Sequence, residues 1–436
     1  MTSADASLAR YRLLLGLLTP LLLGYTLWQA LRERSWRYLR ERCGLYRTAA
    51  APSPVWLHAA SVGELNAALP LIAALRARQP QLPLLLTTAT ASSAALAARR
   101  LPADVPHVFL PLDWRGAVRR FFDHYRPRCA LIMETELWPN LFAASAARAI
   151  PLIIVNGRLS LRTRNAPRWL CRQYRCALGR VDAVLARSEA DRAGFIALGA
   201  AAARVQVVGN IKFSADVQAA SANISLPRPY VLAASTRDGE EALLLQAWQQ
   251  AEHGGRLLVI VPRHPRRVQE ILRDLALPPP HIAVRSRGQD VTAQTRVYLA
   301  DTFGELTGFM AGAELVFMGG SLVPRGGQNV LEAAHLGKAL VFGPHMDNFA
   351  DECRLLLEHG GAVQVEDVRA LSTVFTALLA QPEHRAALGT AAQQLVERRR
   401  DMATRYAVAL EEWCHQDGTA ATNIDTRRRD AEAQSR

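Results

Sequence analysis

Carboxylates of the first half stand where apolar runs pass into helix-like patterns. Glu64 lies in WLHAASVGELNA, directly after the apolar run at 55–60 and at the start of helical spacing. The positive end of a helix dipole favours a carboxylate in the first turn, which is one explanation for Glu64. The other is catalytic. The same dipole would keep a general base ionised while it takes a proton from a bound hydroxyl group. Gly63, which has no side chain, would let the molecule that carries this hydroxyl approach the backbone closely.

The sequence METELWPN places Glu134 at the end of another apolar run and Glu136 two residues later. A carboxylate at such a point is costly unless it is paired or used. Two interpretations stay open: one of these residues caps the helix that Pro139 indicates, or one belongs to a site. Lys212 follows a third run, in VQVVGNIKF. Lysine is scarce in this arginine-rich chain, which favours a role in neutralising a phosphate or carboxylate over an ordinary surface position.

The second half carries groups suited to anions. Arg263 and His264 follow the run VIVP, and a guanidinium group offers a fork of donors that matches phosphate oxygens. VFMGGSLVPRGGQNVLEAA (316–334) then combines an apolar run, two glycine pairs and a helix start at Asn329 and Glu332. Backbone amides of such a loop are predicted to cradle an anion. The spacing matches neither the dinucleotide-binding glycine motif nor a P-loop.

Apolar runs without polar alternation recur between helical patterns, which is typical of parallel sheets covered on both faces. We expect strands at 55–60, 83–88, 107–112, 129–134, 151–155, 182–186 and 205–209. Further strands are expected at 230–236, 256–265, 282–286, 296–301, 314–321 and 339–345. The prediction is an α/β protein of two Rossmann-like, doubly wound domains facing a cleft, with ligands at the carboxyl ends of the strands.

The domain boundaries follow from changes in composition. Residues 214–229 are polar, contain two prolines and lack periodicity, so they are expected to be a linker. The predicted order is a membrane anchor with a basic collar (1–45), a first domain (46–213), the linker, a second domain (230–415) and a disordered tail (416–436).

The stretch Leu13–Leu31, LLLGLLTPLLLGYTLWQAL, contains no charged residue. Its 19 residues reach across a hydrocarbon core of about 30 Å. More arginines follow it than precede it, which places the bulk of the protein in the cytoplasm. An uncleaved single-pass anchor is favoured, although Gly16, Pro20 and Gly24 weaken the helix and leave a position in the membrane interface open.

The net charge of +13 suits nucleic acid, an anionic membrane or a phosphorylated substrate. Because the basic stretches lack interleaved aromatic residues, a nucleic-acid partner is not expected. The six cysteines include no C-x-x-C pair, so neither a metal site nor a disulfide framework is expected. We expect no cofactor.

In order along the chain, HAASVGE, METELWPN, SEAD with LGA and VGNIKF, VPRHP, GGSLVP, and GPH with NF are similar to motifs of one family. The sequence resembles the 3-deoxy-D-manno-octulosonic acid (Kdo) transferases of lipopolysaccharide synthesis, from the anchor to about residue 400. The resemblance implies a glycosyltransferase-B fold with an acceptor domain followed by a donor domain. It also implies inverting transfer of Kdo from CMP-Kdo to a lipid A precursor (lipid IVA) at the cytoplasmic face of the inner membrane, beside anionic lipids.

The same resemblance assigns roles to individual residues. Glu64 matches the catalytic base, and Glu134 and Lys212 match positions that stabilise the transition state. The positions that bind CMP correspond to Arg263, His264, Gly304, Glu305, Leu306, Asn329, Val330, Leu331 and Glu332.

This chain departs from the family pattern at the donor loop. Arg325 and Gln328 stand where the family usually reads the two histidines of HGGHNPLEPA, and Met346 and Asp347 replace the common Thr-Phe. The sequence TATASSA also replaces a T-P-T-G-type loop. Two alternatives therefore stay open: a membrane-anchored nucleotide-sugar-binding homologue with altered catalysis, or another two-domain nucleotide-sugar enzyme.

Overall fold

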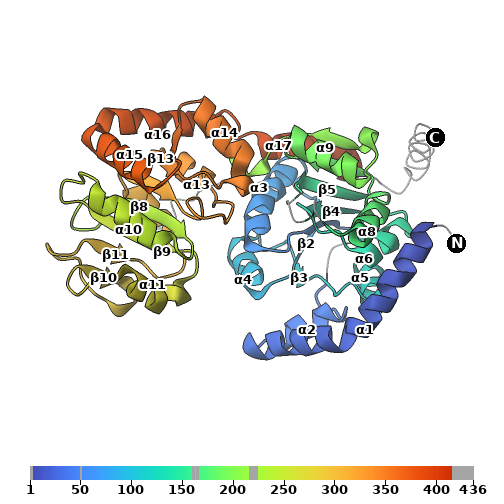
Figure 1. Cartoon of the computed structure of the whole chain (residues 1–436). Helices are drawn as coiled ribbons and strands as arrows, with labels where there is room; N and C mark the ends of the chain where they lie inside the picture. Colours follow the sequence, from blue (N-terminus) through green and yellow to red (C-terminus); the bar gives the residue numbers. More distant parts are fainter. Residues whose placement is uncertain (1–2, 50–51, 160–162, 164–165, 216–223, 415–436) are drawn as a thin grey trace. The chain divides into compact units, whose positions relative to one another are not determined.

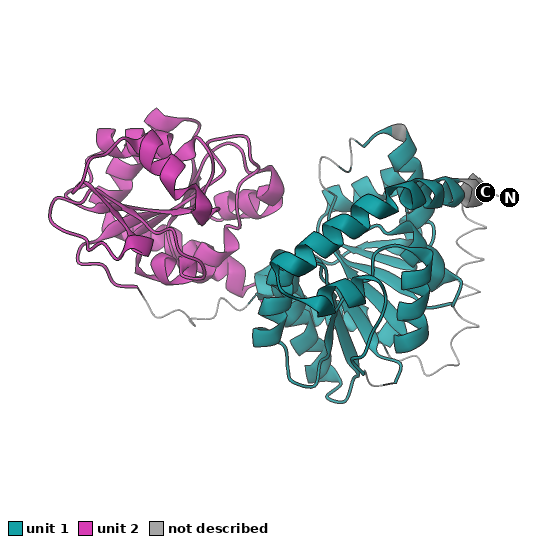
Figure 2. Ribbon diagram, turned by 90° about the horizontal axis from the view of Figure 1, so that it is seen from below, with its two compact units in different colours: residues 1–215, 401–436 teal, residues 216–400 magenta. Residues whose placement is uncertain are grey.

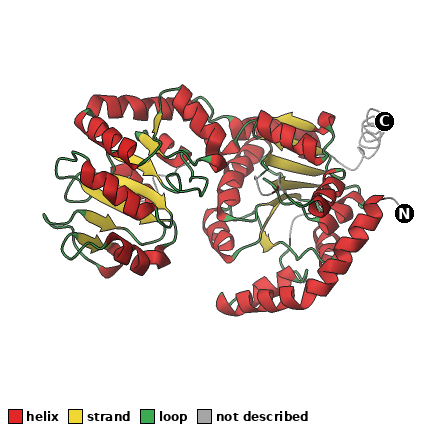
Figure 3. Ribbon diagram, viewed as in Figure 1, coloured by secondary structure: helices red, strands yellow, loops and turns green. Residues whose placement is uncertain are grey.

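The computed structural model describes residues 3–49, 52–159, 163, 166–215 and 224–414 of the 436-residue chain. The chain forms two compact units, residues 1–215 with 401–436 and residues 216–400 (Figure 2). Each unit is a parallel sheet between layers of helices (Figure 3). The predicted α/β architecture with two Rossmann-like domains is confirmed.

The sheet of unit 1 has the strand order β3-β2-β1-β4-β5-β6-β7 across the described residues, and every pairing is parallel. All of these strands fall within or beside the apolar runs that predicted them. They are β1 (Val55–His58), β2 (Leu84–Thr88), β3 (His107–Phe109), β4 (Cys129–Met133), β5 (Leu152–Gly157), β6 (Ala183–Ala186) and β7 (Val205–Val207).

Successive strand residues of unit 1 pack into two separate cores, because side chains alternate between the faces of a sheet. Leu57 and Leu131 pack against Leu71 of α3 on one face. Trp56 and Ile132 join a second cluster on the other. The helices around the sheet are α1 (Ser3–Arg32), α2 (Trp36–Arg42), α3 (Val62–Arg78), α4 (Ala91–Arg100), α5 (Arg115–Tyr125), α6 (Pro139–Ala146), α8 (Arg168–Leu178) and α9 (Glu189–Leu198), with 3₁₀ turns η1 (Ala202–Arg204) and η2 (Ile211–Ser214) (Figure 1).

Unit 2 has the strand order β10-β11-β9-β8-β12-β13-β14, also parallel. Its strands are β8 (Tyr230–Thr236), β9 (Leu257–Pro262), β10 (Ile282–Val284), β11 (Val297–Leu299), β12 (Leu315–Met318), β13 (Leu340–Phe342) and β14 (Ala362–Gln364). The sequence did not predict β14, because its three residues make too short an apolar run and only its pairing with β13 defines it.

The helices of unit 2 connect these strands, and two more follow the last strand. They are α10 (Glu240–Gln250), α11 (Val268–Leu275), α12 (Leu306–Gly312), α13 (Leu331–His335), α14 (Ala350–Glu358), α15 (Val368–Ala380) and α16 (Pro382–Glu397), with the turns η3 (Pro265–Arg267), η4 (Arg285–Arg287) and η5 (Asp347–Phe349).

The end of the predicted second domain belongs to unit 1. The helices α17 (Met402–Ala409) and α18 (Glu411–Cys414) lie within the predicted range 230–415, but they pack in unit 1. Tyr406 is fully buried in the core that contains Leu71, and its hydroxyl donates to the carbonyl of Gly209 at 2.7 Å. The apolar face of α17 therefore corrects the boundary to about residue 400. Half of the predicted linker (216–223) and all of the predicted tail lie outside the described residues.

The apolar N-terminal segment forms the 30-residue helix α1, which has the length and composition of a membrane span. It packs against α2, α6 and α8 of unit 1 (Figure 1). A single crossing of the membrane remains a prediction from composition.

Candidate active site

The first turn of α3 holds Glu64 in a closed set of hydrogen bonds. The backbone N–H of Glu64 donates to the Ser61 hydroxyl at 3.3 Å, and that hydroxyl donates to the Glu64 carboxylate at 3.1 Å. The second carboxylate oxygen accepts from the N–H of Ala60 at 2.8 Å. This arrangement resembles a capping box. Glu64 thus has the structural role that its position predicts, and a catalytic role has to be compatible with it.

The electrostatic environment of Glu64 differs from the expectation. Burial, followed by the charges of Glu134 and Glu136, raises the pKa of Glu64 to about 8, against the lowering effect of the bonds from Ala60 and Ser61. This direction is opposite to the expected effect of the helix start, because burial and two like charges outweigh the dipole. No cation among the described residues forms an ion pair with Glu64. A carboxylate with such a pKa is a stronger proton acceptor than an ordinary one.

Glu134 and Lys212, both predicted site residues, form an ion pair. The ammonium Nζ of Lys212 lies 2.6 Å from Oε1 of Glu134, and both side chains are largely buried. Burial raises the pKa of Glu134, but Lys212, Arg158 and Arg187 lower it by more, so the pKa lies below its usual value. Glu134 also has a φ of +55°, a left-handed conformation that costs a non-glycine residue about 1 kcal/mol. The chain accepts this strain directly after β4.

Neither Glu134 nor Glu136 caps the helix that follows. α6 begins at Pro139 as predicted, but its first amides, those of Asn140 and Leu141, donate to the carboxylate of Asp113 at 2.9 and 2.8 Å. Glu136 is half-buried, and burial is the main reason that its pKa is raised. The capping interpretation of METELWPN is therefore excluded, and the site interpretation stays open.

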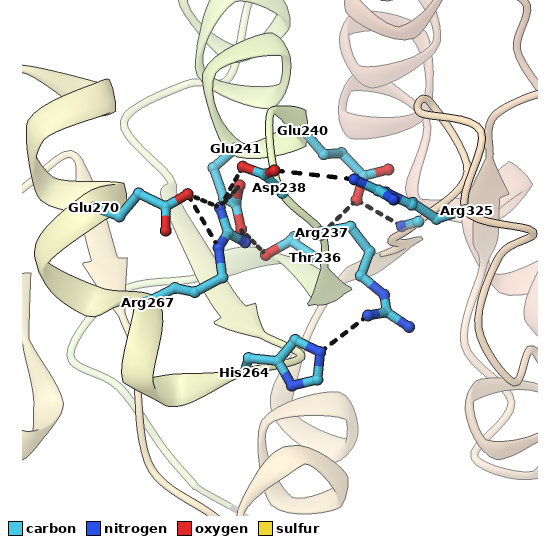
Figure 4. A network of polar contacts seen from close by, with 10 residues as sticks. Thr236, Arg237, Asp238, Glu240, Glu241, His264, Arg267, Glu270 and Arg325 are labelled. Carbon is cyan, nitrogen blue, oxygen red and sulfur yellow. Dashed lines mark hydrogen bonds and ion pairs between the residues drawn. The ribbon is translucent and has the colours of Figure 1, made fainter.

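In unit 2, the predicted His264 lies with Arg237, Arg267 and Arg325 around the end of β8 (Figure 4). The charge of the predicted Arg263 acts on both His264 and Arg237, so these four arginines form one arginine group. Arg237 Nη1 lies 3.0 Å from Nε2 of His264 and donates to it. Burial and then the charges of Arg237, Arg263 and Arg267 lower the pKa of His264, which keeps its ring neutral. Burial, followed by Arg263 and Arg325, also lowers the pKa of Arg237. This concentration of positive charge is suited to an anionic ligand.

A side chain of the protein occupies the first part of the glycine loop after β12. The carboxylate of Glu240, at the start of α10, accepts from the amides of Gly320, Ser321 and Leu322 at 2.6, 2.9 and 3.0 Å. It also accepts from the amide of Arg237 at 3.1 Å (Figure 4). The anion cradle therefore exists, but a side chain of the protein fills it. The amides further along the loop, up to the start of α13, stay a prediction.

Asn329 and Glu332 lie close to the arginine group. The Asn329 amide donates to Glu332 Oε1 at 3.1 Å, and its carbonyl oxygen accepts from the N–H of Leu331 at 3.2 Å, directly after Val330. Burial raises the pKa of Glu332, while Asn329 and the charge of Arg263 lower it. The structure thus brings Arg263 and Glu332 into one electrostatic environment.

The predicted donor residues at 304–306 lie in a separate loop before α12. Glu305 is ion-paired with Arg285 at 2.5 Å, and Gly304 has a φ of +85°. Leu306 is the first residue of α12. Among the described residues, no hydrogen bond joins this loop to the arginine group, so these three stay a prediction.

Arg325 and Gln328 differ from the family pattern, and Arg325 belongs to the arginine group while Gln328 lies beside it. Arg325 reaches Asp238 at 3.9 Å, and a Cβ built on Gly320 would meet both Gln328 and Arg237. Met346 is buried and packs against Gly327. Arg237 and Glu240 were not predicted as site residues. Both follow β8, and ligands of such sheets bind at the carboxyl ends of the strands, so their position could have indicated them.

Comparisons with known proteins agree with these observations. A family model described as 3-deoxy-D-manno-octulosonic-acid transferase (kdotransferase) matches residues 37–215. The chain is 36% identical over 389 residues to the 3-deoxy-D-manno-octulosonic acid transferase of Bordetella pertussis, covering 85% of this chain and 90% of that protein. It is 31% identical over 400 residues to the Haemophilus influenzae enzyme of the same name, covering 88% and 94%.

A solved structure of UDP-GlcNAc 2-epimerase from Neisseria meningitidis, bound to UDP-GlcNAc, shares the fold. Its TM-score is 0.54 at 15% identity, and the match covers 79% of this chain and 98% of that chain. This likeness supports the two-domain glycosyltransferase-B fold and carries no statement about chemistry. The sequence identity to the two transferases extends over both units. The chain therefore belongs to the 3-deoxy-D-manno-octulosonic acid transferase family.

Proposed function

We propose that this protein is an inverting glycosyltransferase that transfers Kdo from CMP-Kdo to a hydroxyl group of the lipid A precursor lipid IVA. Family membership supports the transferred sugar. The observation that carries the proposed mechanism is Glu64, a half-buried carboxyl with a pKa of about 8 beside the Glu134–Lys212 pair.

In the proposed reaction the Glu64 carboxylate accepts the proton of the acceptor hydroxyl. The hydroxyl oxygen forms a bond to the anomeric carbon of Kdo as the bond from that carbon to the phosphate oxygen of CMP breaks. CMP leaves with the bonding electron pair. A single displacement of this kind inverts the anomeric configuration. Since CMP is a good leaving group, we propose that no metal ion is needed.

Lys212 and Glu134 stabilise the transition state in this proposal. Their ion pair holds the ammonium group of Lys212 in a fixed position, and preorganised charges of this kind need no rearrangement during the reaction. On unit 2, Arg263 and Arg237 neutralise the departing phosphate, while His264 and Asn329 position the nucleotide. Glu332 holds Asn329 in place through the hydrogen bond between them.

The proposed location is the cytoplasmic face of the inner membrane, where α1 attaches the protein. The net charge of +13 favours anionic lipids there, and no nucleic-acid partner is proposed.

The test uses the purified full chain with CMP-Kdo and tetra-acylated lipid A precursor, with the products weighed by mass spectrometry. In Glu64→Gln, kcat should fall by about 10²-fold or more while CMP binding persists. Glu189→Gln is the matched control, because Glu189 also lies in the first turn of a helix, α9, but is exposed. Full turnover by Glu64→Gln would exclude this mechanism. A wild-type protein that binds CMP without transferring Kdo would favour the homologue with altered catalysis.

A further inference from the structure

One face of α1 is less exposed than the other between Leu8 and Ala30. Buried and half-buried residues recur every three or four positions, which is the spacing of a single helical face. This inner face consists of Leu8, Tyr11, Leu15, Thr19, Leu22, Thr26, Gln29 and Ala30. It includes most of the polar residues of the apolar stretch, and the hydroxyls of Thr19 and Thr26 donate to Leu15 and Leu22 carbonyls within the helix.

Polar bonds attach the N-terminal end of this face to three segments of unit 1. The Tyr11 hydroxyl donates to Asp113 at 2.9 Å, which lies between β3 and α5. Arg12 Nε donates to Asn140 of α6 at 2.8 Å. The side-chain amide of Gln173 in α8 donates to the carbonyl of Ser7 at 3.1 Å.

The C-terminal end of α1 is attached to the same unit by apolar packing. Ala30 is 3% exposed and forms a cluster with Tyr38 of α2 and Phe109 of β3. Arg12 and Ala30 are about 27 Å apart along a helix, close to the thickness of a bilayer core of about 30 Å. If α1 crossed a membrane, one of these two ends would have to leave unit 1. In the predicted orientation this is the N-terminal end, and the buried carboxylate of Asp113 would lose the Tyr11 hydroxyl.

The opposite face of α1 is apolar and uncovered. Leu13, Leu17 and Leu21 are 69%, 71% and 72% exposed. Trp28 and Leu31 continue the same stripe, and both are more than half exposed. A continuous apolar stripe of this length is typical of a surface that binds a partner or a membrane. Exposed arginines flank it at Arg10, Arg32 and Arg34.

We propose that α1 lies in the plane of the membrane, in place of the single crossing that its composition predicts. Its inner face stays on unit 1 and its outer leucines enter one leaflet at the boundary of head groups and acyl chains. The partner is an anionic phospholipid surface, because arginines flank the stripe at both ends and Trp28 lies within it. The partly polar, less exposed inner face and the apolar, exposed outer face fit this position, since protein covers one side and lipid the other.

Cross-linking in native membranes tests the geometry. Ser7→Cys and Gln173→Cys are combined in the full chain, with Cys171→Ser and Cys176→Ser to remove neighbouring thiols, and treated with a short bis-maleimide. The in-plane helix predicts efficient cross-linking. Ala9→Cys with Gln173→Cys is the negative control, because Ala9 is exposed. Arg78→Cys with Glu411→Cys is the positive control, because these two side chains form an ion pair at 2.6 Å within unit 1. If only the positive control cross-links, α1 leaves unit 1 and the proposal is overturned.

Flotation with vesicles of phosphatidylglycerol and phosphatidylethanolamine tests the partner. Leu17→Asn combined with Leu21→Asn should release the protein from the vesicles. Val408→Asn is the control and should not, because it replaces an exposed apolar side chain on α17, outside the stripe. Unchanged flotation of the double variant would show that the stripe contacts something other than lipid, such as a second copy of the chain, and would overturn the proposal.

Discussion

The ammonium group of Lys212 and the carboxylate of Glu134 lie 2.6 Å apart, although 78 positions separate them in the sequence. Glu134 follows β4 in the middle of the sheet, and Lys212 belongs to η2, directly after the edge strand β7. The pair is neutral as a whole, whereas Glu64 forms no ion pair with the described residues. This division of roles is the basis of the predictions for unit 1.

Lys212→Met should destabilise the protein by about 1–3 kcal/mol, because it leaves the largely buried Glu134 carboxylate without its partner. Urea unfolding of the full chain measures this change. The double variant Lys212→Met with Glu134→Gln is the control and should recover most of the loss, since no charge is then left unpaired. Equal stability of the single variant and the wild type would show that the ion pair contributes little.

The activity should depend on pH through Glu64. Because burial, Glu134 and Glu136 raise its pKa to about 8, kcat/KM should rise with pH and level off above about 8. Glu136→Gln removes one of the two like charges and should shift this rise to lower pH, while the bonds from Ala60 and Ser61 remain. Profiles of kcat/KM against pH for both proteins provide the measurement. Superimposable profiles would mean that Glu136 does not act on Glu64.

Stability should depend on pH in the opposite direction. The folded pKa of Glu64 lies above the ordinary value of 4.5, so the unfolded chain releases this proton first as the pH rises. The resulting loss of stability develops between about 4.5 and 8 and is complete above that range. Glu64→Gln should therefore match the wild type at the acidic end and be more stable at the alkaline end. Thermal unfolding at both ends tests this, and a constant difference would contradict it.

Glu240→Ala should disorganise the glycine loop of unit 2. Four backbone amides lose their acceptor, and each buried unsatisfied donor costs about 1–3 kcal/mol, although water entry will recover part of this. CMP affinity should fall with stability, as measured by calorimetry and urea unfolding. Asp238→Asn is a matched control in the same turn, because Asp238 is exposed. Unaltered CMP binding by Glu240→Ala would separate the loop from the nucleotide site.

Arg237→Ala should weaken CMP binding by about 10–100-fold, the usual value of a hydrogen bond to a charged group. Arg237→Lys should recover part of the affinity, because the charge is kept while the forked geometry is lost. Arg273→Ala is the control, since Arg273 lies on α11 and its Nε donates only to the Gln269 carbonyl of its own helix. If Arg237→Ala binds CMP as tightly as the wild type does, Arg237 has no role in the donor site.

Much of this protein could be predicted from local pattern alone. Buried parallel strands consist of unbroken apolar runs, so the strands and the side chains at their carboxyl ends, including Glu64, Lys212 and Arg263, follow from the sequence. Strand order, long-range packing and burial do not, because they depend on contacts between distant segments.

Only the tertiary structure therefore brought Lys212 to Glu134 and placed the Glu240 carboxylate in the glycine loop. It also placed Tyr406, from the C-terminal part of the chain, in the core of unit 1 that contains Leu71. For Glu64 it raised the pKa, whereas the helix dipole alone would lower it. The dipole can be inferred from a single helix start, but desolvation and two neighbouring carboxylates exist only once the chain is folded.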